Sequence, residues 1–304
     1  MKKIFNLIVS FVLLAGFSAC NKDGSDKPGL PPAPVPTVNY KGLTFISSGN
    51  STVCLAKVGA PDEITLEYST DESQWNPYTL GEKISLADGT FLLFRAGEQK
   101  NLTFSKGSDS YYHFEISGPV TAQGNIMSLL DRDFSTPLST NAFFALFEGC
   151  TSLLSAPELP ATTMAQGCYF RMFAECTGLK SAPELPAEAL AYNCYGRMFK
   201  GCSALTYVPD LPATKMEAYC YNSMFANCTS LKFAPELPAK RLESNCYQHM
   251  FEGCTSLTSA PELPATELVS NCYEFMYKDC RNLRYVIGLF TTEPSEKTTK
   301  DWLS

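Results

Sequence analysis

The chain has 304 residues, with 24 lysines and arginines against 31 aspartates and glutamates, and a formal net charge of −7. Its 45% hydrophobic and 18% charged residues are typical of a globular protein and exclude an intrinsically disordered chain. The acidic balance and the lack of any lysine or arginine cluster also exclude a nucleic-acid-binding protein, because phosphate binding requires clustered cations.

Residues 1–19 have the pattern of an export signal. Two lysines precede an apolar run over 4–16, and small residues stand directly before Cys20. This arrangement resembles a bacterial lipoprotein signal, in which cleavage leaves Cys20 as a lipidated first residue. An ordinary secretory signal with an incidental cysteine is the alternative. The resemblance implies a membrane anchor made of acyl chains rather than of a membrane-spanning helix.

Residues 20–37 are expected to form a tether behind this anchor. The segment 21–26 resembles the acidic export tag of surface lipoproteins in Bacteroides-type bacteria, which implies an outer-membrane protein that faces the cell exterior. Residues 27–37 contain five prolines, so they favour an extended, semi-rigid spacer.

Residues 38–118 carry short alternating apolar runs separated by turn signals, which predicts a small β-sandwich-like domain. We expect Trp75 to pack in this domain rather than to bind a ligand, and Cys54 to be a buried thiol. Residues 119–141 are predicted to link this domain to the next and to cap it. Asp131 and Asp133 in this linker are interpreted as turn carboxylates, because the other ligands of a calcium loop are missing.

Residues 142–297 contain one 26-residue unit written six times, followed by a C-terminal end at 298–304. The second unit starts at Cys168 and reads CYFRMFAECTGLKSAPELPAEALAYN. Positions are counted from the first residue of each unit as 0. Apolar residues at positions 0, 1, 4, 5 and 8 predict a short amphipathic helix, and Gly or Asn at position 7 suits its end. The two prolines that follow restrict the predicted strand to about 179–182.

These patterns predict an α+β multidomain protein: a small N-terminal β-sandwich-like domain, then a leucine-rich repeat solenoid with a short strand and a short helix per repeat. Eleven cysteines lie in the repeats, and we expect them to be free buried thiols. Two cysteines eight residues apart on a helix would be ~12 Å apart, which is too far for a disulfide. Pairing across 18 residues, as between Cys150 and Cys168, and pairing between equivalent cysteines of neighbouring repeats are the alternatives.

The repeated pattern MFxGCTSLxxAPELPA, seen for example at 198–202 and 182–186, resembles the BspA-like leucine-rich repeat surface proteins of Bacteroides. The resemblance covers residues 142–297. It implies a curved right-handed solenoid on the cell surface and adhesion to host or microbial partners. It implies no catalytic residues.

Residues suited to catalysis or to metal binding are scarce. The chain has two histidines, His113 and His249, and lacks the common nucleophile, phosphate-loop and zinc-protease motifs. We therefore expect no enzyme activity, no cofactor and no metal site. One acidic residue recurs at position 16 of the repeats and is interpreted as part of a solvated edge, with a cation-binding row as the alternative. The row consists of Glu158, Glu184, Asp210, Glu236 and Glu262.

Position 13 varies between small and aromatic residues, and Tyr207, Phe233 and Tyr285 occupy it in three repeats. Such aromatics are candidate contacts for a protein or a glycan partner, or they pack on neighbouring prolines. The sequence thus predicts a lipid-anchored binding protein of the cell surface. Adhesion to host or microbial surface proteins is the first hypothesis, and carbohydrate binding for a glycan-uptake system is the alternative.

Overall fold

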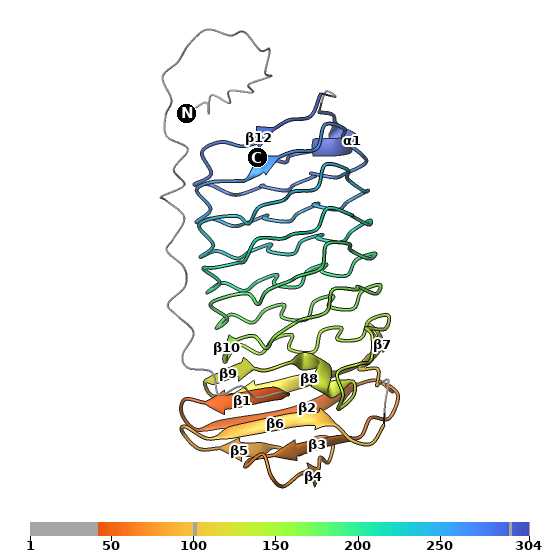
Figure 1. Ribbon diagram of the computed structural model, residues 1–304. Coiled ribbons are helices and arrows are strands. Elements are labelled where there is room, and N and C mark those ends of the chain that lie inside the picture. Colours follow the sequence, from red (N-terminus) through yellow and green to blue (C-terminus); the bar gives the residue numbers. More distant parts are fainter. Residues whose placement is uncertain (1–41, 100–101, 292–293, 304) are drawn as a thin grey trace.

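Figure 1 shows the computed structural model of the chain, which describes residues 42–99, 102–291 and 294–303. A part built of strands lies at one end, and a regular stack of coils rises from it to the C-terminal end. The proposed signal, Cys20 and the tether lie outside the described residues.

The N-terminal part contains nine strands. They are β1 (Leu43–Ser47), β2 (Ser51–Val58), β3 (Leu66–Ser69), β4 (Asn76–Pro77), β5 (Ile84–Leu86), β6 (Phe91–Ala96), β7 (Ser105–Gly107), β8 (Ser110–Ser117) and β9 (Val120–Gln123). Strands β5, β2, β8 and β7 form a four-stranded sheet in that order. The other sheet has six strands in the order β10-β9-β1-β6-β3-β4, and its β10 (Leu153–Ser155) comes from the first repeat.

Aromatic side chains join the two sheets and the first repeat. The ring of Phe45 in β1 lies 6.0 Å from that of Phe94 in β6 and 5.0 Å from that of Phe114 in the other sheet. Phe147 of the first repeat stacks on Phe114 at 5.2 Å. One continuous hydrophobic core therefore runs from the strands into the coils.

The predicted fold class is wrong, because positions 0 to 8 of the repeats, where a helix was predicted, contain none. The helices among the described residues are the 3₁₀ turn Ile126–Leu129, which precedes the repeats, and α1 (Glu296–Thr299), which begins at the end of the sixth unit. Positions 0 to 8 of each unit instead form a series of four-residue turns. The described part of the chain is built almost wholly of strands, turns and irregular coil.

A left-handed backbone conformation recurs every four residues in these turns. Positions 3 and 7 have positive φ in all six units, and so has the residue directly before position 0. In the third unit these residues are Asn193 (φ 54°), Arg197 (φ 55°) and Gly201 (φ 77°). An α-helix cannot contain such residues at this interval, because each one reverses the local turn of the chain.

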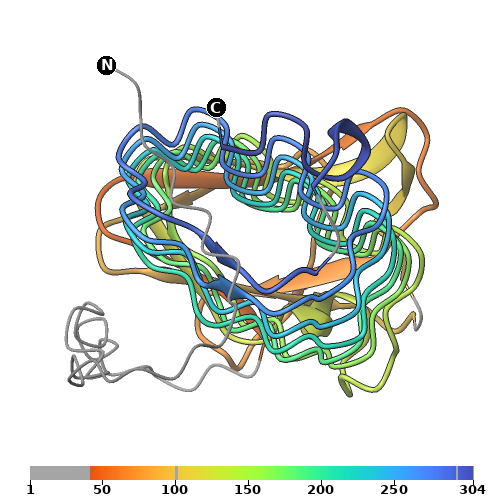
Figure 2. The ribbon, with the colours of Figure 1, turned by 90° about the horizontal axis from the view of Figure 1, so that it is seen from above.

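The backbone amides of the turns alternate between two kinds of partner. Amides at even positions bond within their own coil, as when Met172 N–H donates to the Tyr169 carbonyl at 3.2 Å. Amides at odd positions bond to the next coil, as when Phe173 N–H donates to the Met198 carbonyl at 2.9 Å. Every turn is thus closed internally and also tied to its neighbour. Figure 2 shows the coils superimposed along the stack axis as a result.

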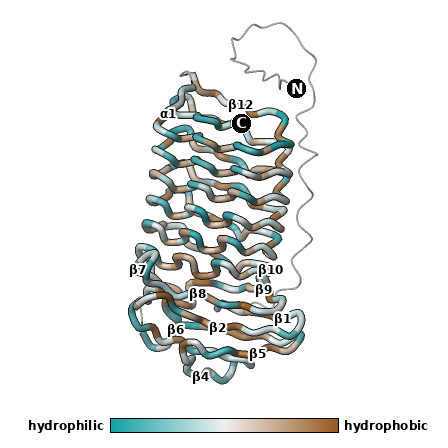
Figure 3. Tube along the Cα trace, turned by 180° about the vertical axis from the view of Figure 1, so that it is seen from behind, coloured by the Kyte–Doolittle hydropathy of each residue, from teal (hydrophilic) through white to brown (hydrophobic). Residues whose placement is uncertain are grey.

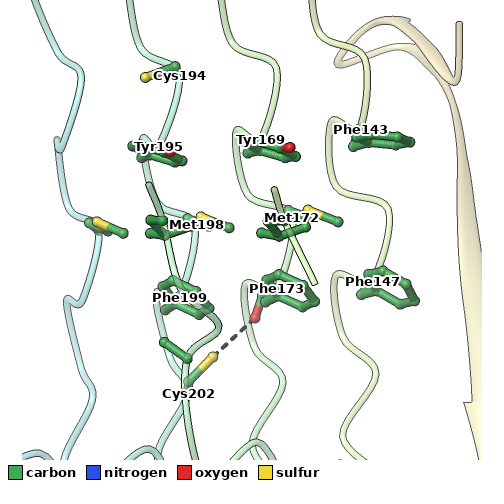
Figure 4. Packing of buried hydrophobic residues seen from close by; sticks show 14 of the residues in the cluster. Phe143, Phe147, Tyr169, Met172, Phe173, Cys194, Tyr195, Met198, Phe199 and Cys202 are labelled. Atoms are coloured by element: carbon green, nitrogen blue, oxygen red, sulfur yellow. Dashed lines mark hydrogen bonds between the residues drawn. The ribbon is translucent and has the colours of Figure 1, made fainter. Parts of the chain in front are cut away.

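The four-residue period explains the apolar pattern of the repeat. Positions 1 and 5 point inward and stack on the same positions of the next coil (Figure 4). Tyr169 and Tyr195 stack at 5.9 Å and 2°, and Phe173 and Phe199 at 5.5 Å and 3°. Such stacks run through all six coils, from Phe143 to Tyr273 and from Phe147 to Tyr277.

The part of each coil that follows position 8 contains the two prolines and few residues in regular strands. β10 pairs with β9, and β11 (Glu262–Leu263) pairs with β12 (Ile287–Gly288), both in parallel. Elsewhere the coils meet through single bridges, such as Ser181 with Tyr207. Because proline has no amide to donate, a longer ladder cannot form here.

All twelve described cysteines, eleven of them in the repeats, are free and buried. The helical spacing that we used to exclude pairing does not apply, since no helix is present. The position-8 thiols instead donate to a backbone carbonyl of the preceding coil. Cys202 Sγ lies 3.1 Å from the Phe173 oxygen (Figure 4), and the position-8 cysteines of the other later coils make the same contact. In the first coil, Cys150 donates instead to the Phe114 carbonyl of β8.

The C-terminal end continues the turn side of the stack by part of a seventh coil. Tyr273 N–H donates to the Thr298 carbonyl at 3.0 Å, and Tyr277 N–H donates to the Trp302 carbonyl at 2.9 Å. The Trp302 ring lies 6.2 Å from that of Tyr273 and 5.8 Å from that of Phe290. This segment therefore covers the end of the tyrosine stack.

Candidate functional site

A groove crosses the turn side of the second to fifth coils. It has a volume of about 510 Å³ and combines aromatic, amide and charged side chains. Its lining consists of Phe170, Tyr192, Asn193, Arg197, Lys200, Tyr219, Asn222, Ser223, Gln248, His249 and Glu252. Figure 3 shows hydrophilic and hydrophobic residues alternating along the coils.

Gly196 stands at position 2 of the third coil, next to two residues that line the groove. The same position is Phe170 in the coil before and Asn222 in the coil after. A Cβ at Gly196 would collide with the side-chain oxygen of Asn193 and lie 2.9 Å from the Phe170 ring. A larger residue here would therefore displace the side chains of Asn193 and Phe170, which both line the groove.

A line of hydrogen bonds holds the polar floor in place. Asn222 Nδ2 donates to Gln248 Oε1 at 2.8 Å, and Gln248 Nε2 donates to Glu274 Oε2 at 2.5 Å. The Ser223 hydroxyl donates to Asn222 Oδ1 at 3.1 Å. Asn222 and Ser223 are buried, so their side chains are held before any ligand arrives.

Aromatic rings of the second and third coils border the groove. Tyr192 is 45% exposed, and its ring meets that of Tyr219 edge to face at 5.7 Å. Phe170 is half-buried and carries the guanidinium of Arg197 at 5.9 Å from its centroid. Flat apolar faces are thus presented next to hydrogen-bonding groups.

His249 of the fifth coil also lines the groove. Its Nδ1 lies 2.8 Å from Glu252 Oε2, and its ring stacks on Phe275 at 4.8 Å and 20°. Lys278 Nζ lies 3.4 Å from the other Glu252 oxygen. These contacts balance the charge of Glu252 within the protein.

The three predicted contact aromatics do not line this groove. Tyr207 and Phe233 are half-buried on the bridge side of the coils, where Tyr207 pairs with Ser181 and Phe233 with Ser259. Tyr285 in the last coil is 59% exposed. The sequence singled out these aromatics because they vary at one position. Positions 2 and 3 also vary from repeat to repeat, but the predicted helix gives them no role beyond facing solvent.

The other candidate sites have structural surroundings. Trp75 carries the Arg95 guanidinium at 3.7 Å from its ring centroid. Asp131 is buried and accepts the amides of Asp133 and Thr136 at 2.6 Å, as expected of a turn carboxylate. The five acidic side chains of position 16 are exposed. Within the described part of the chain, no group of three or more His, Cys, Asp or Glu side chains could hold a metal ion.

No helix in residues 42–99, 102–291 and 294–303 has the length and apolar character needed to cross a membrane. Comparison of the chain with protein-family models, curated proteins and solved structures finds no match. The function must therefore be inferred from the residues of this chain.

Proposed function

We propose that this protein is a binding protein of the cell surface whose groove holds a saccharide chain. The observation that carries this proposal is the side-by-side arrangement of aromatic faces (Phe170, Tyr192, Tyr219) and preordered amide groups (Asn222, Gln248) in one open groove. Sugar rings offer apolar C–H faces that pack on aromatic rings, and hydroxyl groups that both donate to and accept from side-chain amides. Pockets that combine apolar walls with a few fixed polar groups are typical ligand sites.

The stack also suits a polymer better than a single small molecule. The groove is open and extends over four coils, and equivalent rings in successive coils are 5.3–6.0 Å apart. A chain of sugar units lying along the stack would meet a new set of side chains at each coil. Several weak contacts, one set for each coil, can therefore add up to the affinity for a sugar chain.

A lipid at Cys20 and a proline-rich tether are the proposed means of holding the groove away from the membrane. This part of the proposal rests on the sequence pattern of residues 1–37. It gives an outer-membrane protein whose binding part faces the exterior and which captures its ligand without altering it chemically.

The test is a binding screen of the purified protein against an array of neutral, uronic-acid, sialylated and sulfated glycans. A double variant, Tyr192→Ala with Tyr219→Ala, should lose most of the binding, because it removes two aromatic walls. Tyr285→Ser, an aromatic loss outside the groove, is the matched control and should bind as the unaltered protein does. No glycan bound, or equal loss in variant and control, would refute a saccharide-binding groove.

Adhesion to a surface protein is the second candidate, and the last coil favours it. Tyr285, Ile287 and Leu289 are 59%, 49% and 42% exposed, and among the described residues β12 has a strand partner only on its β11 side. An exposed strand edge flanked by apolar side chains can accept an extended strand of a protein partner. If this edge is used, Tyr285→Ser with Ile287→Ser abolishes adhesion to host surface proteins while the groove variant has no effect on it.

A further inference from the structure

Two cations at one end of the groove lack an ion-pair partner. Arg197 and Lys200 both line the third coil, and neither forms a salt bridge with any of the described residues. Arg197 contacts the Phe170 ring instead. Unpaired cations in a groove are notable in a chain whose net charge is −7.

The equivalent cations of other coils are neutralised by a definite geometry. Arg171, at position 3 of the second coil, pairs with Glu148, at position 6 of the first coil. Lys278, at position 6 of the sixth coil, pairs with Glu252, at position 6 of the fifth coil, at 3.4 Å. In both cases the partner carboxylate stands at position 6 of the preceding coil.

The same geometry shows why the two groove cations stay unpaired. For both Arg197 and Lys200, position 6 of the preceding coil is Ala174, and position 6 of the following coil is Ala226. Both alanines are buried and offer no acceptor for an ammonium or guanidinium group. Neither Arg197 nor Lys200 therefore has an acidic residue at position 6 of an adjacent coil. Both positive charges lie beside the aromatic walls of the groove.

From this juxtaposition we infer that the groove takes an anionic saccharide, whose carboxylate or sulfate group binds between Arg197 and Lys200. This inference rests on the proposed saccharide-binding function and names its ligand class. The guanidinium offers two parallel N–H donors that match the two oxygens of a carboxylate or a sulfate, and the ammonium adds a point charge. The Phe170 ring beneath Arg197 holds the planar guanidinium at the groove wall.

A single-stranded nucleic acid also combines anionic groups with flat rings, but it fits this groove less well. Binding a run of phosphates requires a basic surface that follows the backbone. Here two cations stand alone, and Glu252 lines the opposite end of the groove. A saccharide that places one anionic group between these two cations therefore fits the groove better than a polyphosphate does.

The test compares oligogalacturonate with its fully methyl-esterified form, so that only the charge differs, and adds a sulfated oligosaccharide and a single-stranded oligonucleotide as further probes. Each is titrated calorimetrically into the purified full-length protein. We expect the acid to bind at least about tenfold more tightly than the ester, since hydrogen bonds to charged groups are worth more than one decade in affinity. The sulfated probe shows whether the site prefers a sulfate or a carboxylate.

The variants use the geometry of the repeat. Arg197→Gln removes one cation, and Ala174→Glu supplies the missing carboxylate at a position that is already Glu148 in the first coil and Glu252 in the fifth. Each should reduce the affinity for the acid to that for the ester and leave the ester unaffected. Arg171→Gln, one coil away in the same row, is the matched control and should change neither.

The outcomes separate the two proposals. If the acid and the ester bind equally, or if Arg197→Gln and Ala174→Glu leave the difference intact, the anionic ligand class is wrong while saccharide binding stands. Binding of the oligonucleotide in preference to both saccharides also overturns the inference. If no glycan of the array binds, the proposed function and the inference fail together.

Discussion

Replacing Ala145 by glycine tests the turn structure of the repeats directly. Ala145 stands at position 3 of the first coil with φ 53°, and Ala174 stands at position 6 of the second coil with a φ outside the left-handed region. Both side chains are buried. Ala145→Gly and Ala174→Gly are therefore the same chemical change at two sites that differ in backbone conformation.

The expected magnitudes follow from that difference. A residue with a Cβ in the left-handed conformation costs about 1–2 kcal/mol, and glycine removes this strain at position 145 only. Loss of the buried methyl group and the greater freedom of glycine in the unfolded chain destabilise both variants, by about 1–2 kcal/mol together. These losses cancel in the comparison. The free energy of unfolding of Ala145→Gly should therefore be about 1–2 kcal/mol higher than that of Ala174→Gly, and close to that of the unaltered protein.

Urea denaturation followed by circular dichroism measures this difference. The transition midpoints are compared at equal slope, because a stack of repeats can unfold in more than one step. In a helix both substitutions would destabilise alike, by about 1 kcal/mol. Equal destabilisation of the two variants would therefore refute the four-residue turns and restore the helical interpretation.

Three further outcomes are expected. Burial raises the pKa of the Cys272 thiol to about 11 and that of Cys150 to about 12, whereas an unfolded thiol titrates near about 8.5. Above about pH 8.5 the thiols of the unfolded state lose their protons before those of the folded state, so the free energy of unfolding should fall as the pH rises toward the pKa values of the folded state. A urea midpoint that is constant from pH 8 to pH 10.5 would contradict this. Alkylation of the denatured, unreduced protein should label a nearly full set of repeat thiols, as weighed by mass spectrometry, whereas four or more disulfides would disprove free cysteines. Cys20→Ala should release the protein from the membrane fraction, and protease added to intact cells should cut the unaltered protein; full protection of that protein would refute the surface location but not the anchor.

The length and register of the repeat could be predicted from the sequence, but its backbone could not. Over nine residues, positions 0, 1, 4, 5 and 8 fit a period of 3.6 and a period of 4.0 almost equally well, so the apolar pattern alone cannot separate a helix from four-residue turns. Asn193 and its equivalents before position 0 could be interpreted as helix N-caps, and Gly201 as a helix end. The structure shows that both are left-handed turn residues.

The groove was beyond the reach of sequence reasoning for a related reason. Arg197 and Lys200 lie outside the apolar positions in either backbone, so their place at the surface could be predicted. Their relation to Tyr192 and Tyr219 depends on how one coil stacks on the next, which the wrong backbone obscured. The row at position 13 attracted attention because aromatic residues stand out there. The amide and serine residues that line the groove do not stand out in the sequence in this way.

The sharing of β10 between the first coil and the six-stranded sheet has a consequence for how the protein reaches its native state. The amide of Val120 in β9 donates to the Ser152 carbonyl, and that of Phe114 in β8 donates to the Leu146 carbonyl, so the first coil closes on a surface that the N-terminal strands provide. Each later coil needs only its predecessor and closes a loop of the same length, at the same entropic cost. In the native structure the N-terminal strands thus supply the surface that the first coil needs, and each later coil finds the same kind of surface on its predecessor.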